Sequence, residues 1–166
     1  TKGRLAQLRE MVAGFEAKDT IGIGHTRWAT HGEPSFENSH PHTNCAGDIA
    51  VVHNGIIENY MKLKSWLQDT GAVFVSETDT EVVAHLINYY YQGDLLAAVR
   101  AAVEKLEGSY ALGVICEKQP DMIVAARKDS PLVVGVGKGE NLIASDIPAL
   151  LEYTRDVIFL NDNELV

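Results

Sequence analysis

The sequence predicts an α+β fold, in which helices and strands are segregated along the chain. Helical patterns dominate residues 60–107, where apolar side chains recur every three or four positions. From residue 110 onward the period shortens, and short strand patterns follow one another with turn residues between them. A regular strand–helix–strand alternation is absent, which argues against a parallel α/β fold. At 166 residues the chain is long enough for one domain with its own core.

The first third of the chain predicts one helix, two strands and a long loop. Residues 1–18 have the amphipathic spacing of a helix, and residues 20–26 are typical of a strand. Residues 28–47 contain two prolines and several glycines, which predicts a loop of the length usually associated with function. Residues 49–53 predict a short buried strand. The Asn54–Gly55 pair that follows favours a tight turn.

The middle of the chain predicts three helices and one more strand. Residues 60–68 form the first helix, and residues 73–75 form a strand. The spacing Thr78-x-x-Glu81 is a capping-box signature, which predicts a helix that runs to about Tyr91. A third helix begins at Asp94 and ends before Gly108.

The last third predicts a series of strands and one short helix. Turn residues at 119–121 and 137–139 separate the strands, and Pro148 fits the first turn of the helix that starts at residues 145–148. The Gly135-x-Gly137-x-Gly139 run is interpreted as a turn, because no helix follows it as in a nucleotide-binding loop. The predicted strands span residues 110–116, 122–127, 132–136, 142–144 and 156–160.

Composition excludes several classes of function. A formal charge of −9 argues against nucleic-acid binding, which needs a basic patch. No apolar run approaches the roughly 20 residues of a membrane helix, and no signal-peptide pattern opens the chain. Two cysteines, Cys45 and Cys116, do not make a disulfide framework, so we expect a cytoplasmic protein.

The histidines raise the possibility of a metal site. Five of the six precede residue 54, and imidazole suits zinc, copper and nickel. However, His40-Pro41-His42 offers only two ligands, and no cysteine pair or HExxH motif accompanies it. We therefore expect loop or core histidines and no metal.

Arg27 and Asp79 could together recognise a free amino acid. A guanidinium binds an α-carboxylate with two hydrogen bonds, and a carboxylate accepts from an α-ammonium. The alternative is that Asp79 only favours a helix start and that Arg27 is a surface charge.

Asn54–Gly55 and Cys45 also allow two interpretations each. A side-chain amide beside a free backbone N–H can form an oxyanion hole, whereas the same dipeptide also makes an ordinary turn. Cys45 could act as a nucleophile, but no base is evident beside it in the sequence, and unpaired cysteines are mostly inert. Trp28 could line a pocket or fill a core.

Three segments together resemble signature blocks of one family. Residues 25–32 are HTRWATHG, residues 51–59 are VVHNGIIEN and residues 76–81 are SETDTE. Residues 129–133 (DSPLV) and 144–146 (ASD) match the later part of the pattern. The chain thus resembles, over essentially its whole length, the glutaminase domain of glutamine–fructose-6-phosphate aminotransferases, which are class II glutamine amidotransferases.

The resemblance implies an N-terminal-nucleophile hydrolase fold, an αββα sandwich of two antiparallel sheets between helical layers. It implies hydrolysis of the glutamine side-chain amide, in which the thiol of an N-terminal cysteine attacks and its own α-amine is the base. A thioester forms and ammonia is released. No cofactor is implied.

The resemblance also assigns roles to residues of this chain. The Asn54 side chain and the Gly55 N–H would form the oxyanion hole. Arg27 would bind the α-carboxylate of glutamine, and Asp79 its α-ammonium. Further residues would line the pocket; these are Trp28, Thr30 and His31.

One departure from the family concerns the nucleophile. The family begins Cys-Gly-Ile-Val-Gly, a few dozen residues before the point that matches Thr1, and neither Cys45 nor Cys116 has a free α-amine. We therefore expect residues 1–166 to be a partial type 2 glutamine amidotransferase domain that lacks its first strands and is inactive by itself. An exposed sheet edge would favour self-association.

In the parent protein the resemblance implies that ammonia passes to fructose 6-phosphate, giving glucosamine 6-phosphate. It also implies a C-terminal sugar-isomerase domain and a homodimer. Two alternatives stay open. One is a non-catalytic glutamine-binding module, and the other is the glutaminase domain of a purine-pathway amidophosphoribosyltransferase. Trp28, His31 and the IIEN ending of residues 56–59 favour the hexosamine enzyme over the purine enzyme.

Overall fold

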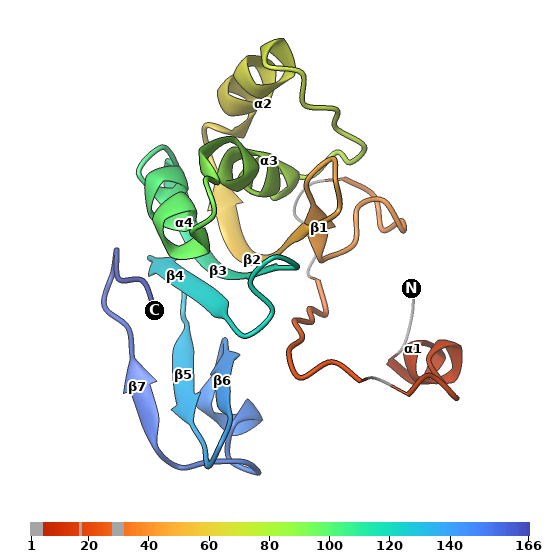
Figure 1. Cartoon of the computed structure of the whole chain (residues 1–166), viewed down its shortest axis with the longest axis vertical. Helices are drawn as coiled ribbons and strands as arrows, with labels where there is room; N and C mark the ends of the chain where they lie inside the picture. The colour runs from red at the N-terminus through yellow and green to blue at the C-terminus, as the bar shows by residue number, and fades with distance from the viewer. Residues whose placement is uncertain (1–4, 17, 28–31) are drawn as a thin grey trace.

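The computed structural model describes residues 5–16, 18–27 and 32–166, and in these residues two antiparallel sheets can be followed (Figure 1). The first sheet has four strands in the order β1-β2-β3-β4, and the second has three in the order β6-β5-β7. The strands of the first sheet are β1 (His42–Thr43), β2 (Ile49–Ile57), β3 (Gly108–Cys116) and β4 (Ile123–Lys128). Those of the second are β5 (Val133–Val136), β6 (Asn141–Ala144) and β7 (Val157–Phe159).

Three helices cover one face of the four-stranded sheet (Figure 1). They are α2 (Tyr60–Asp69), α3 (Glu81–Tyr90) and α4 (Leu95–Val103). The core lies between these helices and the sheet, where Leu86 and Val99 meet Leu112, and all three are inaccessible to solvent. Helix α3 packs against α2, α4 and β2, and its residues are therefore buried on most sides.

The second sheet stacks on the opposite face of the first. A smaller cluster of buried side chains fills this interface, and includes Ala111 and Ala125 from the first sheet and Val134 from the second. Gly113 permits the close approach, because a Cβ there would lie 2.7 Å from Ile143 Cδ1. On the outer side of the second sheet lies a short 3₁₀ helix, η1 (Ile147–Ala149). The two stacked antiparallel sheets with a helical layer confirm the predicted α+β sandwich class.

The N-terminal helix is shorter than predicted. It spans α1 (Leu5–Met11), and none of its residues is buried. Figure 1 shows it away from both sheets. The apolar face that predicted it, which includes Leu5 and Phe15, stays exposed to solvent. Since tertiary packing supplies most helix stability in proteins, a helix without a partner among the described residues extends for only two turns.

Two predicted strands are not strands. Residues 20–26 and 73–75 are irregular and pair with no strand. An apolar run resembles a strand by its spacing, but a ladder also requires a neighbouring strand edge. At residues 75 and 76 the backbone N–H groups instead donate to the carboxylate of Glu81, at 2.9 and 2.7 Å.

The Asn54–Gly55 pair does not form a turn. Strand β2 continues through both residues to Ile57, and they pair with Ala111 and Tyr110 of β3. Gly55 has a φ of 126°, and a Cβ there would collide with the carbonyl oxygen of Ser109. The glycine is therefore required by the close approach of β3, and the turn interpretation is wrong.

The capping box predicted at Thr78 is also absent. Helix α3 begins at Glu81 with Thr80 as its N-cap, and no side chain caps it. Helix α4 begins next to Asp94, as predicted, and the Asp94 carboxylate caps it by accepting from the Ala97 N–H at 3.0 Å. No helix of the described residues is long and apolar enough to cross a membrane.

Candidate active site

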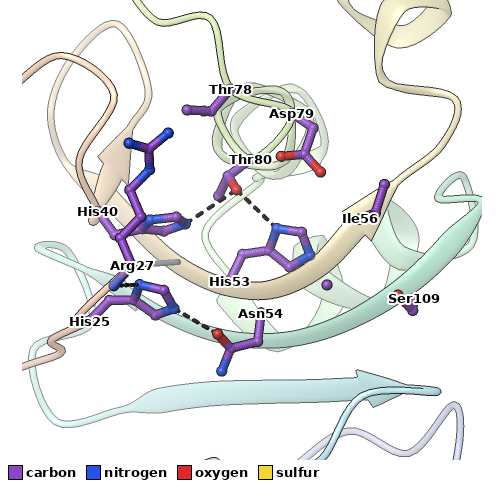
Figure 2. Close-up of a pocket in the computed structure, with 11 residues that line it drawn as sticks. His25, Arg27, His40, His53, Asn54, Ile56, Thr78, Asp79, Thr80 and Ser109 are labelled. Atoms are coloured by element: carbon purple, nitrogen blue, oxygen red, sulfur yellow. Dashed lines mark hydrogen bonds between the residues drawn. The ribbon is translucent and has the colours of Figure 1, made fainter. Parts of the chain in front are cut away.

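Four of the predicted site residues line one cavity of about 310 Å³. The cavity lies beside β2, where His25, Arg27 and His40, from the segment between α1 and β1, and the residues just before α3 approach the strand (Figure 2). Its volume fits a small metabolite. The lining residues are His25, Arg27, His40, His53, Asn54, Gly55, Ile56, Thr78, Asp79, Thr80 and Ser109.

The Arg27 guanidinium is held by its own loop. Its Nη2 donates to the carbonyl of Gly32 at 3.1 Å, and its Nη1 to the carbonyl of Glu33 at 3.4 Å. The backbone at Arg27 is left-handed, with a φ of 41°. Such conformations are uncommon for a residue with a Cβ and concentrate at functional sites.

His25 fixes the orientation of the Asn54 amide. Its Nδ1 accepts from the backbone N–H of Arg27 at 2.8 Å, so the ring proton of neutral His25 is on Nε2. This Nε2–H donates to Asn54 Oδ1 at 2.8 Å (Figure 2). The Nδ2 donor of Asn54 is thereby turned away from His25, and it reaches Ser145 Oγ at 3.3 Å.

The N–H of Gly55 points toward the cavity side of β2. In an antiparallel ladder, alternate residues of a strand direct their N–H groups toward the same neighbour. Glu58 donates to Glu107 across the ladder at 2.9 Å, whereas Ile57 donates away from β3, to Asp79 Oδ2 at 2.8 Å. Gly55 precedes Ile57 by two residues, so its N–H shares that direction. Asn54 and Gly55 both line this cavity, while the Nδ2 group of Asn54 donates to Ser145 Oγ beside the second cavity.

Asp79 is buried, with only 3% of its surface exposed. The bond from Ile57 holds one of its carboxylate oxygens, and Asp79 also lines the cavity. In the view of Figure 2, the Asp79 carboxylate and the Arg27 guanidinium lie on either side of Thr80. A cation and an anion thus border the same cavity, as recognition of a zwitterion requires.

Thr80 links two histidines of the cavity. Its hydroxyl lies 2.9 Å from His53 Nδ1 and 3.2 Å from His40 Nε2. A hydroxyl has one proton, so at least one of the two rings must donate to it. Of the other ring nitrogens, His40 Nδ1 is buried and has no hydrogen-bond partner among the described residues. The His53 ring also lies near the backbone of Ser109, which favours its protonated form.

Burial lowers the pKa values of three histidines at or near the cavity, His40, His42 and His53. Burial lowers the pKa of His40 to about 2, and charge on neighbouring His25 and His42 would lower it further. Burial also lowers the pKa of His42 to about 4, although the Glu81 carboxylate opposes this change. For His53, burial lowers the pKa more than nearby Asp79 raises it. The rings therefore act as neutral hydrogen-bonding groups.

A second cavity, of about 190 Å³, lies on the other side of Asn54. It runs between the two sheets and is bordered by residues 22–25, by β3 and by residues 141–145. Asn54 and His25 line both cavities. The Asn54 side chain thus lies at the boundary between the two cavities.

The structure brings together Arg27, Asn54, Gly55 and Asp79, which come from three distant segments. Trp28, Thr30 and His31, which the resemblance places in the same pocket, lie outside the described residues. Sequence reasoning gave no role to several other lining residues; these are His25, His40, His53, Thr80 and Ser109. The signals for the histidines were their concentration before residue 54 and, for His25 and His53, their place in the signature blocks. Among the described residues, no three His, Cys, Asp or Glu side chains are placed to hold a metal ion.

Comparison with known families gives one match. The profile of the glutamine amidotransferase domain matches residues 25–152, which contain all seven predicted site residues.

The chain is similar to several curated proteins over nearly its whole length. It is 65% identical to the glutamine–fructose-6-phosphate aminotransferase (isomerizing) of Caldanaerobacter subterraneus subsp. tengcongensis over 99% of this chain. It is 63% identical to the protein of the same name from Clostridium tetani, and 54% to that from Aquifex aeolicus. The chain spans 27 to 28% of the length of these relatives.

Two solved structures share the fold. The glutamine phosphoribosylpyrophosphate amidotransferase from B. subtilis has a TM-score of 0.65 and 29% identity, and the match covers 78% of this chain and 29% of that one. A structure described as the allosteric regulatory enzyme of purine biosynthesis has a TM-score of 0.69 and 27% identity, over 84% and 30% of the two chains.

Proposed function

The chain belongs to the glutamine amidotransferase domain family, and on this premise we propose that it is the glutaminase part of a glutamine–fructose-6-phosphate aminotransferase. The observation that carries the proposal is the single cavity lined by Arg27, Asn54, Gly55 and Asp79. The high identity to aminotransferases of that name supports this acceptor over the purine precursor.

Glutamine binds through its two backbone charges. The Arg27 guanidinium donates to the α-carboxylate, and the buried Asp79 carboxylate accepts from the α-ammonium. Both groups are held in advance, Arg27 by the carbonyls of Gly32 and Glu33 and Asp79 by the Ile57 N–H. Such preorganisation lowers the entropic cost of binding. By the family resemblance, Trp28, Thr30 and His31 also contribute to glutamine binding.

The side-chain carbonyl of glutamine lies against Asn54 and Gly55. When a nucleophile attacks the amide carbon, negative charge develops on this oxygen, and the Asn54 Nδ2–H and the Gly55 N–H stabilise it. His25 keeps the Asn54 amide in the required orientation. The tetrahedral intermediate then collapses, and the amide nitrogen leaves as ammonia.

The attacking thiol is not supplied by either cysteine of this sequence. Cys116 is buried at the end of β3, and Cys45 lies outside the residues that line the cavity. We therefore propose that residues 1–166 are a partial domain and do not hydrolyse glutamine alone. The nucleophile is an N-terminal cysteine of the parent protein, with its own α-amine as the base.

The parent protein is a cytoplasmic homodimer in which ammonia passes to a sugar-isomerase domain. There it aminates fructose 6-phosphate to glucosamine 6-phosphate. The match covers only 27 to 28% of the length of the relatives, which supports a longer parent chain.

The test uses the full-length protein that contains these residues. We expect glutamate release from glutamine, and glucosamine 6-phosphate, identified by mass spectrometry, when fructose 6-phosphate is added. If the protein instead forms phosphoribosylamine when phosphoribosyl pyrophosphate replaces the sugar, the proposed ammonia acceptor is wrong. The proposed glutaminase activity would still stand. Glutamine binding without any glutamate would indicate a non-catalytic module. Absence of glutamine binding would overturn the whole proposal.

A further inference from the structure

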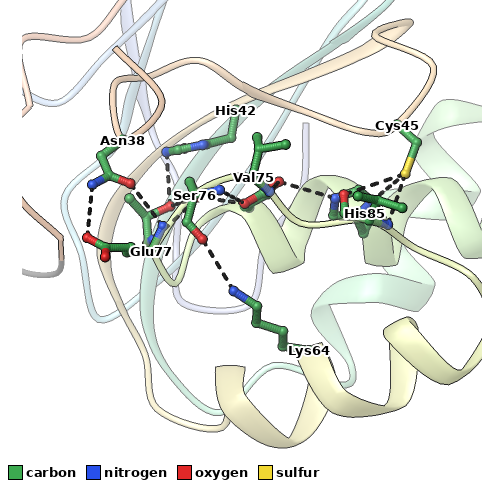
Figure 3. Close-up of polar contacts among 11 residues, drawn as sticks. Asn38, His42, Cys45, Lys64, Val75, Ser76, Glu77 and His85 are labelled. Atoms are coloured by element: carbon green, nitrogen blue, oxygen red, sulfur yellow. Dashed lines mark hydrogen bonds and ion pairs between the residues drawn. The ribbon is translucent and has the colours of Figure 1, made fainter. Parts of the chain in front are cut away.

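Cys45 lies in the turn between β1 and β2, where it faces helix α3 (Figure 3). The turn is rigidly held by buried Asn44. Its Nδ2 donates to Asp48 Oδ1 at 2.7 Å and to Asn88 Oδ1 at 2.9 Å, and its Oδ1 accepts from the Ile49 N–H at 3.1 Å. Cys45 itself is exposed to solvent. An accessible thiol is therefore presented from a fixed backbone.

Three polar groups surround the Cys45 sulfur. The backbone N–H of Val73 donates to Sγ at 3.3 Å, and His85 Nδ1 lies 3.8 Å from it. In its protonated form the thiol donates to the carbonyl of Val73, at 3.7 Å. A sulfur that accepts from an N–H gains stabilisation as a thiolate, and an imidazole within reach can take the thiol proton.

His85 is backed by a buried carboxylate. The ring is 3% exposed and packs against Phe74, with ring centroids 4.4 Å apart. Its Nε2 lies 3.5 Å from Glu81 Oε1, at ion-pair distance, and has no closer partner among the described residues. The ring thus faces a thiol with one nitrogen and a carboxylate with the other.

The Glu81 carboxylate is charged at neutral pH. Burial alone would raise its pKa, but the neighbouring His85 ring, together with hydrogen bonds from the Ser76 hydroxyl and from the N–H groups of Val75 and Ser76, lowers it to about 2. The Ser76 Oγ bond is 2.6 Å long. A fixed negative charge beside Nε2 stabilises the imidazolium that forms when Nδ1 takes a proton.

We propose that Cys45 is a reactive thiol that forms mixed disulfides with low-molecular-weight disulfides, with His85 as its proton acceptor and Glu81 as the positioning carboxylate. The side chains of Cys45, His85 and Glu81 do not line the glutamine cavity. The inference does not depend on the proposed function.

The exchange balances without another reactant. His85 Nδ1 takes the Cys45 proton, and the thiolate attacks one sulfur of the small disulfide. A new S–S bond forms to Cys45 while the S–S bond of the reagent breaks. The leaving thiolate takes the proton from His85, so one small thiol is released for each Cys45 that is oxidised.

Cys116 is an internal control in the same chain. It is 3% exposed, so a small disulfide cannot reach it in the folded protein. The two cysteines are in different tryptic peptides, so mass spectrometry distinguishes their adducts.

The experiment exposes the full-length protein to oxidised glutathione and, in parallel, to iodoacetamide over a pH series, and quantifies both peptides. We expect glutathione on Cys45 and none on Cys116. We also expect the alkylation rate of Cys45 to fall less than tenfold between pH 8 and pH 6. A simple thiol loses roughly 80-fold over that range, because its thiolate fraction follows a pKa near 8.5.

Three variants separate acid–base chemistry from packing. His85→Gln should slow Cys45 alkylation at pH 7 by at least tenfold and restore the steep pH profile. Glu81→Gln should slow it severalfold. Phe74→Leu disturbs the packing of the same ring without removing a proton acceptor, and should change the rate by less than twofold. A steep pH profile in the unmodified protein would overturn the proposal, as would equal effects of His85→Gln and Phe74→Leu.

Discussion

His25 Nε2 lies 2.8 Å from Asn54 Oδ1, and this bond joins the irregular segment before residue 28 to strand β2. The same ring accepts from the Arg27 backbone through its other nitrogen. One imidazole thus sets both the rotamer of the oxyanion-hole amide and the start of the loop that carries the guanidinium. The group proposed to bind the substrate, Arg27, and the group proposed to polarise its amide, Asn54, are therefore both held by His25.

Replacement of His25 should lower catalysis more than binding. His25→Leu removes the donor to Asn54, and we expect kcat for glutamine hydrolysis by the full-length protein to fall about tenfold, a part of the 10²–10³ loss that follows deletion of an oxyanion donor. The KM for glutamine should change less than threefold. His25→Gln retains a donor and an acceptor and should recover most of kcat. A change confined to KM in both variants would contradict this role.

Replacement of Asp79 should weaken binding of the ammonium group. Asp79→Asn keeps an acceptor for the Ile57 N–H and so should fold normally. Loss of the charge should cost about 2 kcal/mol, or roughly 30-fold in KM for glutamine. Glutaramic acid, which lacks the amine, provides the control, since the unmodified protein and the variant should bind it equally. The exposed carboxylate of Glu77 offers a matched change, because Glu77→Gln should leave KM unaltered.

Substitution of Gly55 should destabilise the fold. A Cβ at this position meets the Ser109 carbonyl, and the φ of 126° is unfavourable for any L-residue. We expect Gly55→Ala to cost about 3 kcal/mol in urea unfolding. Gly139→Ala is the matched control, since Gly139 has a φ of 81° and open space around it. Its cost should be about 1 kcal/mol, from the backbone alone. Equal costs would show that the contact with Ser109 is unimportant.

Stability should decrease as the pH falls below 6.5. The unfolded chain protonates His42 near pH 6.5, whereas burial holds the pKa of the folded state at about 4. Between these values the unfolded state binds the extra proton, so stability is fully present above pH 6.5 and is lost toward pH 4. Each such histidine contributes a slope of about 1.4 kcal/mol per pH unit. His42→Gln should reduce the measured slope by about that amount between pH 6 and pH 5, and an unchanged slope would exclude His42 as the source.

Local patterns in the sequence predicted the elements that local physics determines. Helices α2 and α4 and strands β3 to β7 lie within a few residues of their predicted bounds, since apolar periodicity and turn residues there agree with the packing. The pattern failed where tertiary contacts decided the outcome. A dipeptide that favours turns lies inside β2 because β3 pairs with it along nine residues. Glu81 binds the backbone of residues 75 and 76 instead of capping its own helix.

The candidate site was predictable only through motifs. Arg27, Asn54 and Asp79 are far apart in sequence, and spacing alone could not bring them to one cavity. The pairing of Thr80 with His53 and His40 was missed because hydrogen bonds between distant side chains leave no periodic signal. For the same reason no base was expected beside Cys45, although His85 lies 3.8 Å from its sulfur.

One of the two oxyanion donors is beyond the reach of ordinary mutagenesis. The Gly55 amide proton belongs to the main chain, and its direction follows from the alternation of the β2–β3 ladder. A one-residue slip of that ladder would turn this proton toward β3. The N–H of Ile56 would then point to the cavity side in its place. Laboratory redesign of the acyl-transfer step would therefore have to act on strand register, or replace the amide by an ester, rather than exchange a side chain.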